Sequence, residues 1–460
     1  MIKLRSRVCE ILTFTLLACV LSFHAWSDEG QTEPAGELIE YVKRSDESFH
    51  WREVSSGRAG QAEFVEYILT SQTWQDTPWK HQLFILRPSN MSADVRHGLL
   101  FIHGGRWKPE LDTDRRSTQL PREAPYFVRL AESIRAPVAV LRQVPFQPMF
   151  DRREDALIAY TFEQYLKTGE SDWPLLLPMV KSAVRAMDAV QRITAERWNV
   201  SIDSFTVSGA SKRGWTSWLT AAVDHRVMAV APMVIDVLNM SAQMDHQRAT
   251  WGELSDEIRD YAALDLPTQL KTPRGQQLLS IVDPFSYRAQ LTKPKLILLS
   301  TNDRYWPLDA LRLYWSELPS PKHVLYVPNQ GHGLRDVNRV VGGLSAVHRY
   351  AAEGKPLPAS KWSFATKPKT LAISVTSERA PKRVRVWTAN SATRDFREAR
   401  WSSRPCKKQS TGHRCSTERS KTRYTAAFAE STFQDPGTLA FSTSTTVCLL
   451  GPEATPLPTC

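Results

Sequence analysis

Between about residue 81 and residue 350, short apolar runs alternate with helix-like segments, a pattern that few fold classes produce. Residues 155–166 and 179–193 carry apolar residues at i, i+3 and i+4 spacing, as amphipathic helices do. This alternation predicts an α/β fold, a mostly parallel sheet with helices on both faces. Residues 237–290 contain no strand-like run, and we expect an inserted helical cap there. The six strand candidates are HGLLFI (97–102), APVAVL (136–141), SFTVS (204–208), VMAVAPM (227–233), KLILLS (295–300) and HVLYV (323–327).

The pattern changes after Gly354. A Pro-containing linker, KPLPASKW, is followed by the short alternating runs LAISV, RVRVW, TAAFAE, TLAFST and TTVCLL. Short strands separated by turn residues predict a small antiparallel β domain. A chain of 460 residues is too long for one hydrophobic core. We therefore expect an α/β domain at 28–355 and a β-rich C-terminal domain at 356–460.

The first 27 residues are predicted to be a signal peptide. Basic residues precede the apolar stretch ILTFTLLACVLSF (11–23). The small residues Ala25 and Ser27 then predict signal-peptidase cleavage immediately before Asp28. The sequence LLAC, which ends at Cys19, also resembles a lipoprotein cleavage site. We expect export to the periplasm, with secretion or lipid anchoring through Cys19 as the alternatives.

Four of the six cysteines lie in the last 55 residues: Cys406, Cys415, Cys448 and Cys460. An even number of cysteines in an exported segment predicts two disulfides, since the compartment is oxidising. Short loops favour the pairs Cys406–Cys415 and Cys448–Cys460, and the other two connectivities stay open. Zinc would be the rival interpretation, but no CxxC pair favours it. We expect neither a metal nor a cofactor.

The positive charge of the chain is concentrated in the same tail. Residues 356–460 hold 17 Lys or Arg against 7 Asp or Glu, which is +10 of the formal net charge of +11. Nucleic acid is not an expected partner of an exported chain. The tail is predicted to present either a solvated basic face or a surface that docks on an anionic membrane or lipopolysaccharide.

The segment TVSGASKRGW (206–215) places Ser211 between an apolar strand and a predicted helix from Lys212. In α/β hydrolases the nucleophilic Ser sits on such a turn, which requires small neighbours. The consensus G-x-S-x-G has Gly two positions after Ser, whereas this chain has Arg213 there and Gly214 one position later. Taken alone, the motif fits a helix cap as well as a nucleophile.

Three further segments favour the nucleophile. Asp303 follows one predicted strand, and His332 lies in a Gly-rich loop after the next. The order Ser, Asp, His is that of the α/β hydrolases, in which His takes the Ser proton and the carboxylate fixes the imidazole tautomer. Asp309 and Asp236 are weaker candidates for the acid.

The third segment, His103-Gly104-Gly105, ends the first strong strand. An oxyanion-hole loop belongs there, because glycines let backbone N–H groups approach the developing oxyanion. A simple Gly turn is the alternative.

Several longer segments are distinctive as well: REDALIAYTFEQYLKTG (153–169), WPLLLPMVKSAVRAMDAV (173–190), GASKRGWTSWLTAAVDHRV (209–227), APMVIDVLNM (231–240), DPFSYR (283–288), VPNQGH (327–332) and ANSATRDFREARW (389–401). Together they resemble the PhoPQ-activated pathogenicity-related protein family, an α/β-hydrolase-like group of exported proteins. The resemblance implies a hydrolase core with a β-rich extension, and it places nucleophile, acid and base on Ser211, Asp303 and His332. One departure is Arg304, since the family pattern usually has an acid after that Asp.

The sequence thus predicts an exported serine hydrolase that cleaves an ester, thioester or amide with a Ser-Asp-His triad. The resemblance links it to pathogenicity and envelope stress, and the expected substrate is a small molecule or an envelope-derived compound. The alternative is a non-catalytic secreted factor that keeps the hydrolase fold for binding or signalling.

Lys212 and Arg213 raise a separate question. A helix that begins at Lys212 already directs positive dipole toward Ser211, so two cations in its first turn are locally unfavourable. They either turn outward or pair with buried acids such as Asp236. Glucuronoyl esterases have a similar elbow, G-C-S-R-x-G, with a cation after the Ser. The competing hypothesis is that Lys212 aids an oxyanion hole shared with the His103-Gly104-Gly105 loop, and that the substrate carries negative charge near its scissile carbonyl.

Overall fold

The computed structural model describes residues 36–113, 121–452 and 458–459. The predicted signal peptide at 1–27, including Cys19, lies outside these residues, as does Cys460.

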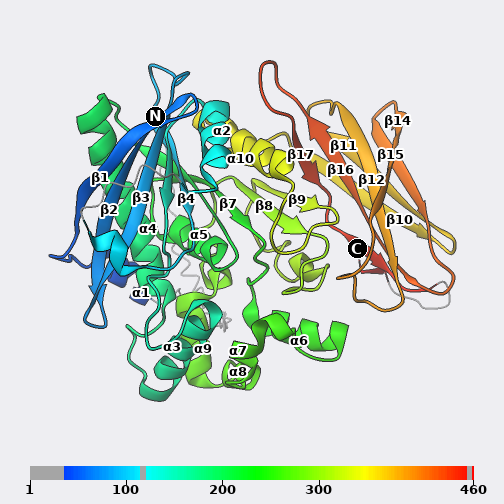
Figure 1. Ribbon diagram of the computed structural model, residues 1–460. Helices are drawn as coiled ribbons and strands as arrows, with labels where there is room; N and C mark the ends of the chain where they lie inside the picture. The colour runs from blue at the N-terminus through cyan, green and yellow to red at the C-terminus, as the bar shows by residue number, and fades with distance from the viewer. Residues whose placement is uncertain (1–35, 114–120, 453–457, 460) are drawn as a thin grey trace, which may run out of the picture. The chain divides into compact units, whose positions relative to one another are not determined.

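A mixed sheet forms the centre of the fold (Figure 1). Its first nine strands are β1 (His50–Ala59), β2 (Ala62–Trp74), β3 (Thr77–Pro88), β4 (His97–Ile102), β5 (Val138–Leu141), β6 (Ser204–Ala210), β7 (Val227–Met233), β8 (Lys295–Ser300) and β9 (Lys322–Val327). They are ordered β1-β2-β3-β5-β4-β6-β7-β8-β9. The pairs from β5 through β9 are parallel, whereas β1, β2 and β3 join antiparallel. This sheet is that of the α/β-hydrolase fold, which confirms the predicted fold class.

Helices cover both faces of this sheet and also form an insert after β7 (Figure 1). On one face lie α1, α4 and α5, and on the other lie α2 and α10. The insert contains α6 to α9 and no strand, as predicted for a helical cap. The helices are α1 (Gly36–Lys43), α2 (Ala124–Ile134), α3 (Glu154–Thr168), α4 (Leu176–Trp198), α5 (Lys212–Val223), α6 (Met240–Trp251), α7 (Arg259–Ala262), α8 (Leu266–Gln269), α9 (Pro273–Val282) and α10 (Val337–Ala352), with short 3₁₀ turns η1 (Pro109–Asp112), η2 (Asp256–Ile258), η3 (Pro284–Tyr287) and η4 (Ala310–Leu313).

Strand β4 shows why the central runs are apolar throughout. Leu100 and Ile102 point to the core under α4 and α5, whereas Leu99 and Phe101 point to the core under α2 and α10. Successive side chains of a strand face opposite sides, so a strand covered on both faces is apolar without alternation.

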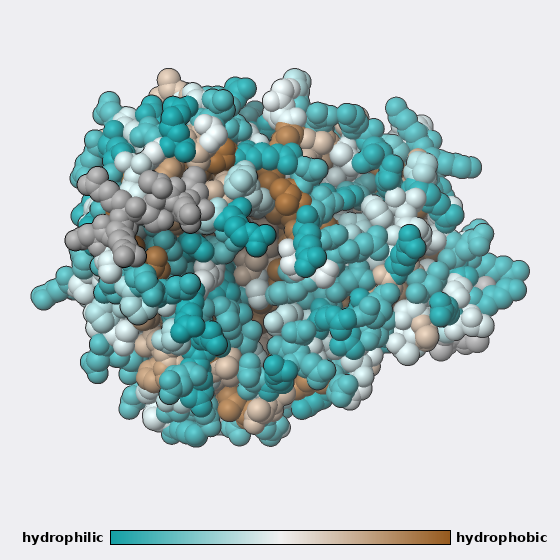
Figure 2. Space-filling view, viewed as in Figure 1, coloured by the Kyte–Doolittle hydropathy of each residue, from teal (hydrophilic) through white to brown (hydrophobic). Residues whose placement is uncertain are grey.

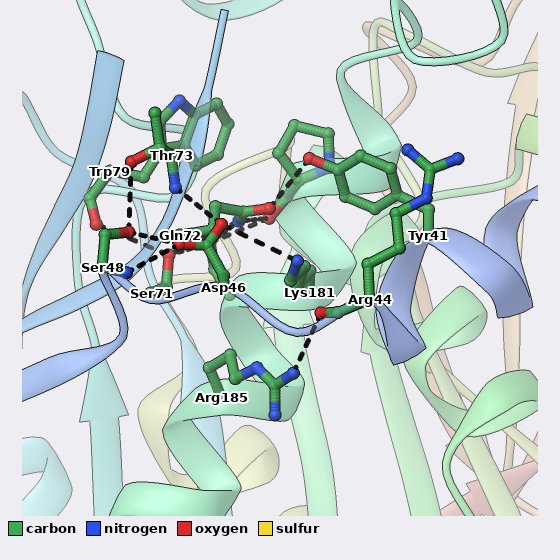
Figure 3. Close-up of polar contacts among 12 residues, drawn as sticks. Tyr41, Arg44, Asp46, Ser48, Ser71, Gln72, Thr73, Trp79, Lys181 and Arg185 are labelled. Carbon is green, nitrogen blue, oxygen red and sulfur yellow. Dashed lines mark hydrogen bonds and ion pairs between the residues drawn. The ribbon is translucent and has the colours of Figure 1, made fainter. Parts of the chain in front are cut away.

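Strand β2 also buries polar side chains, and the helices packed on it supply their partners (Figure 3). Gln72 Nε2 donates to Pro178 O of α4 at 2.8 Å, and Gln72 Oε1 accepts from Tyr41 OH of α1 at 2.9 Å. Lys181 of α4 is buried, with Nζ 3.9 Å from Asp46 Oδ2, and burial lowers the pKa of Lys181. Buried polar groups require such partners, and these hydrogen bonds stabilise the packing of α1 and α4 on β2.

The C-terminal strands divide between two sheets (Figure 1). Strand β17 pairs antiparallel with β9 at Ser444↔Val324, so β17, β16, β12 and β13 continue the main sheet. Strands β10, β11, β15 and β14 form a separate four-stranded antiparallel sheet. The predicted boundary at residue 356 falls between α10 and β10, and the division into two domains stays a prediction. The strands are β10 (Ser360–Lys367), β11 (Thr370–Ser377), β12 (Arg383–Ser391), β13 (Ser402–Pro405), β14 (Lys407–Gln409), β15 (Gly412–Glu418), β16 (Tyr424–Phe433), β17 (Phe441–Ser444), β18 (Cys448–Leu450) and β19 (Pro458–Thr459).

A disulfide joins Cys406, just before β14, to Cys415 in β15. This is the first of the two predicted pairings. The second involves Cys460, which is outside the described residues, and stays a prediction.

The face of the molecule in Figure 2 is mostly hydrophilic, with hydrophobic residues in small groups. Within the described ranges, the exposed large hydrophobic side chains are those of Phe150 and Val337. No helix in the described part of the chain combines the length and the hydropathy that crossing a membrane requires.

Candidate active site

Ser211 lies on the turn between β6 and α5 in a backbone conformation that L-residues rarely adopt, with φ 59° and ψ −132°. Two glycines make the turn possible. A Cβ on Gly209 would lie 2.7 Å from Arg213 O, and one on Gly214 would lie 2.9 Å from Gly209 O. Gly214 therefore performs the packing role of the second Gly in G-x-S-x-G, although it comes one position later. A strained Ser between a strand and a helix is the nucleophile-elbow geometry.

Asp303 and His332 meet at the carboxyl ends of β8 and β9. His332 Nδ1 lies 3.0 Å from Asp303 Oδ2 and 3.1 Å from Oδ1. Tyr305 N–H donates to Asp303 Oδ1 at 2.9 Å, and the Tyr305 ring stacks on the imidazole with centroids 4.1 Å apart. These contacts fix both the carboxylate and the ring.

The other imidazole nitrogen, His332 Nε2, is buried and has no hydrogen-bond partner among the described residues. Across the same residues, no hydrogen bond joins Ser211 Oγ to His332 Nε2. Catalytic hydrogen bonds are often long without substrate and tighten in the complex.

The two weaker acid candidates contact other side chains. Asp309 Oδ1 lies 2.7 Å from His246 Nε2, inside the protein. Asp236 accepts a hydrogen bond from Tyr314 OH, and burial raises the pKa of Asp236 to about 7. Of the three aspartates, Asp303 is the one that contacts His332.

The His103-Gly104-Gly105 loop follows β4 and lies against the first turn of α5. A Cβ on Gly104 would come within 2.7 Å of Arg213 Nη2, so the guanidinium covers the glycine directly. Gly105 has a φ of 140°, and its carbonyl oxygen accepts from Gln147 Nε2 at 2.8 Å. The first N–H groups of a helix have no intrahelical acceptor, so α5 offers donors beside this loop.

Lys212 and Arg213 are buried, and their partners are Glu154 and Asp155 at the start of α3, not Asp236. Lys212 Nζ lies 2.9 Å from Glu154 Oε2 and 3.0 Å from Asp155 Oδ2. Arg213 Nη1 and Nη2 donate to the two oxygens of Glu154, each at 2.8 Å. Burial acts to raise the pKa of Glu154, but the bonds from Arg213 and the charge of Lys212 outweigh it and hold the pKa well below its usual value.

An apolar pocket of about 470 Å³, its open mouth included, lies beside Ser211. Its walls come from the start of α3, from α5, from the segment after β7, from the insert and from the segment after β8. The polar side chains in its lining, tyrosine and tryptophan aside, are Asp155, Ser211 and Lys212. The apolar and aromatic lining includes Trp215, Ile235, Met244, Tyr261, Leu266 and Tyr305.

A second Ser–His contact lies in the interior and has a structural role. Ser71 Oγ is 3.0 Å from His81 Nε2, and both side chains are fully buried. The other ring nitrogen of His81 lies 3.1 Å from Arg142 O, and burial lowers the pKa of His81 to about 4. A neutral imidazole held by a carbonyl oxygen and without a carboxylate partner does not match a catalytic triad.

The described residues contain no cluster of three or more His, Cys, Asp or Glu side chains placed to hold a metal ion.

The strand order, the elbow at Ser211 and the Asp-His pair after β8 and β9 define the class: this is an α/β-hydrolase fold. The family model described as PhoPQ-activated pathogenicity-related protein matches residues 38–397, and the chain belongs to this family. Autocrine proliferation repressor protein A of Dictyostelium discoideum is 32% identical over 390 residues, which cover 78% of this chain and 76% of that protein.

The solved structures that are similar to this chain at low identity include two hydrolases. One is the acetyl xylan esterase from Paenibacillus sp. R4, with 12% identity, a TM-score of 0.43, and coverage of 65% of this chain and 94% of that chain. The other is an S-formylglutathione hydrolase from Agrobacterium tumefaciens, with 12% identity, a TM-score of 0.43, and coverage of 66% of this chain and 99% of that chain.

Proposed function

We propose that this chain is a serine hydrolase that cleaves an ester, thioester or amide. Ser211 is the nucleophile, His332 the general base and Asp303 the orienting acid. The observation that carries the proposal is the orientation of the His332 imidazole. Its Nδ1 is held by Asp303, and its Nε2 is buried and has no hydrogen-bond partner among the described residues. The same fold holds Ser211 in elbow geometry.

The mechanism follows from these positions. Ser211 Oγ attacks the carbonyl carbon while His332 Nε2 takes the hydroxyl proton, and the Asp303 carboxylate stabilises the imidazolium. The N–H groups of Lys212, Gly104 and Gly105 supply donors for the oxyanion, whereas the N–H of His103 already donates to Leu141 O. His332 then protonates the leaving group, and water releases the acyl group from Ser211 by the same steps in reverse order.

We also propose that the chain is exported. The Cys406–Cys415 disulfide supports an oxidising compartment, for which the periplasm is our first choice. The basic tail is proposed to dock on an anionic membrane or lipopolysaccharide, and that binding should weaken with salt because exposed charges are screened beyond about 8 Å.

A second candidate function is a secreted signalling factor that keeps the fold without catalysis. The observation that favours it is the name of the Dictyostelium discoideum relative, a proliferation repressor.

Turnover of simple acyl esters by the purified chain separates the two candidates. Asp303→Asn should lower kcat by about 10⁴-fold, because it favours the wrong imidazole tautomer. Ser71→Ala is the matched control, since it removes a hydroxyl from the buried Ser–His contact and should leave kcat unchanged. A folded wild type that hydrolyses none of the esters would favour the signalling factor.

A further inference from the structure

We propose that the apolar pocket beside Ser211 is the acyl-binding site and that it takes an uncharged, apolar acyl group. The inference rests on the proposed function, because it assumes acyl transfer through Ser211. It differs from the sequence-based hypothesis of a negatively charged group next to the scissile carbonyl.

The position of the pocket assigns it to the acyl side of the substrate. Ser211 lines the pocket, and so does Tyr305, whose ring stacks on the His332 ring with centroids 4.1 Å apart. Tyr305 therefore contacts both the pocket and the imidazole of the general acid, and His332 itself does not line the pocket. His332 has to reach the leaving-group oxygen, sulfur or nitrogen to protonate it, so the leaving group lies on the His332 side and the acyl group enters the pocket.

The pocket walls favour an apolar group. Trp215 comes from the elbow helix, Ile235 follows β7, and Met244 and Leu266 come from the insert. Small-molecule sites are mostly apolar with a few placed polar groups, and the lining of this pocket has that composition. The unbranched thioether of Met244 adapts to acyl groups of different shape.

The charges at the pocket cancel one another. Lys212 and Arg213 supply two cations, and Glu154 and Asp155 supply two carboxylates. The remaining oxygen of Asp155, Oδ1, accepts a hydrogen bond from Tyr261 OH at 3.0 Å. The Asp155 carboxylate therefore contacts both Lys212 of the elbow helix and Tyr261 of the insert. An anionic acyl group would find no unpaired cation here and would lose its hydration beside Asp155, which is unfavourable.

A matched pair of substrates tests the charge preference. p-Nitrophenyl butyrate and mono-p-nitrophenyl succinate have acyl chains of the same length, and they differ in a terminal methyl against a carboxylate. We expect kcat/KM to be about tenfold or more higher for the butyrate, since an unpaired charge is excluded from an apolar site. Equal rates, or a faster succinate, would overturn the inference.

A matched pair of variants tests the location. Leu266→Ala removes a side chain that lines the pocket, whereas Leu279→Ala removes the same atoms from α9, also in the insert but outside the pocket lining. Leu266→Ala should shift the preference toward longer acyl chains by about tenfold in the ratio of kcat/KM for hexanoate and butyrate, and Leu279→Ala should not. The same shift in both variants, or in neither, would contradict the assignment.

Met244→Trp gives a second test that does not leave a cavity. It should fill the pocket and lower kcat/KM for hexanoate about tenfold more than for acetate. An unchanged chain-length profile in this variant would also overturn the acyl site. If the wild type cleaves no ester and its Ser211 resists a fluorophosphonate probe, the proposed function itself fails, which is a different outcome from an altered chain-length profile.

Discussion

Lys212 is a buried cation whose ammonium contacts Glu154 and Asp155. Lys212→Met keeps most of the stem and leaves these carboxylates short of a partner, and unsatisfied buried groups are destabilising. We expect the free energy of unfolding to fall by about 2 kcal/mol, measured by urea denaturation. Lys167→Met is the control, because Lys167 forms an exposed pair with Glu163 worth about 0.3–0.5 kcal/mol. Equal, small losses in the two variants would contradict the described pairing.

Asp236 should make the stability depend on pH. Burial raises the pKa of its carboxyl from 3.8 to about 7, so the folded state holds the proton more tightly than the unfolded state. Its contribution to stability is therefore present below pH 3.8 and is lost as the pH rises through about 7. Asp236→Asn stays neutral and keeps an acceptor for Tyr314 OH.

Relative to wild type, Asp236→Asn should accordingly gain free energy of unfolding at about pH 8 and gain less at about pH 5. Urea denaturation at both pH values measures the difference. The same difference at the two pH values would show that Asp236 does not titrate in this range.

Ser211, Asp303 and His332 could be proposed from the sequence because each follows an apolar strand and their order is diagnostic. The ion-pair partners of Lys212 and Arg213 could not be predicted from the sequence. Glu154 and Asp155 are adjacent acids that match two adjacent cations, but their meeting depends on how α3 packs on α5, which no local pattern encodes. Asp236, the acid proposed from the sequence, is instead bound to Tyr314.

The β6–α5 elbow requires glycine at position 214. A Cβ there would lie 2.8 Å from Ile235 Cγ2 and 2.9 Å from Gly209 O. Gly214→Ala should lower the free energy of unfolding by about 2 kcal/mol, since the backbone oxygen cannot give way. Gly98→Ala in β4 is the control, because its Cβ would meet no atom closer than 3.5 Å. Thermal melts that show similar losses in both variants would argue against the tight elbow.

Strands with two buried faces were the most predictable elements. The bounds predicted for β4, β7 and β8 match those of the structure. The antiparallel strands β1 to β3 were not predicted from the sequence. Strand β1 (HWREVSSGRA) has few apolar residues. Strand β2 buries Ser71 and Gln72, whose hydrogen-bond partners come from α1, α4 and β3. Polar residues satisfied by distant segments interrupt the periodicity on which strand prediction depends.

At the scale of the whole molecule, the tail is joined to the core through β17 and β9, while the disulfide lies in the separate four-stranded sheet. Replacing both Cys406 and Cys415 by Ser should destabilise that sheet by about 2–3 kcal/mol, as expected for a short closed loop. Hydrogen exchange should speed up in β15 and stay unchanged in β16, which pairs with β17 and β12. Equal acceleration in β15 and β16 would show that the two sheets unfold together.

Fluorophosphonate labelling followed by peptide mapping tests the assignment of Ser211 most directly, because the probe reacts with a serine whose hydroxyl is activated by a base. The wild type should carry the adduct on Ser211, Ser211→Ala should carry none, and His332→Asn should react far more slowly. Ser71→Ala should label as the wild type does. A folded wild type that resists the probe, or an adduct on another serine, would contradict the assignment of Ser211 as the nucleophile.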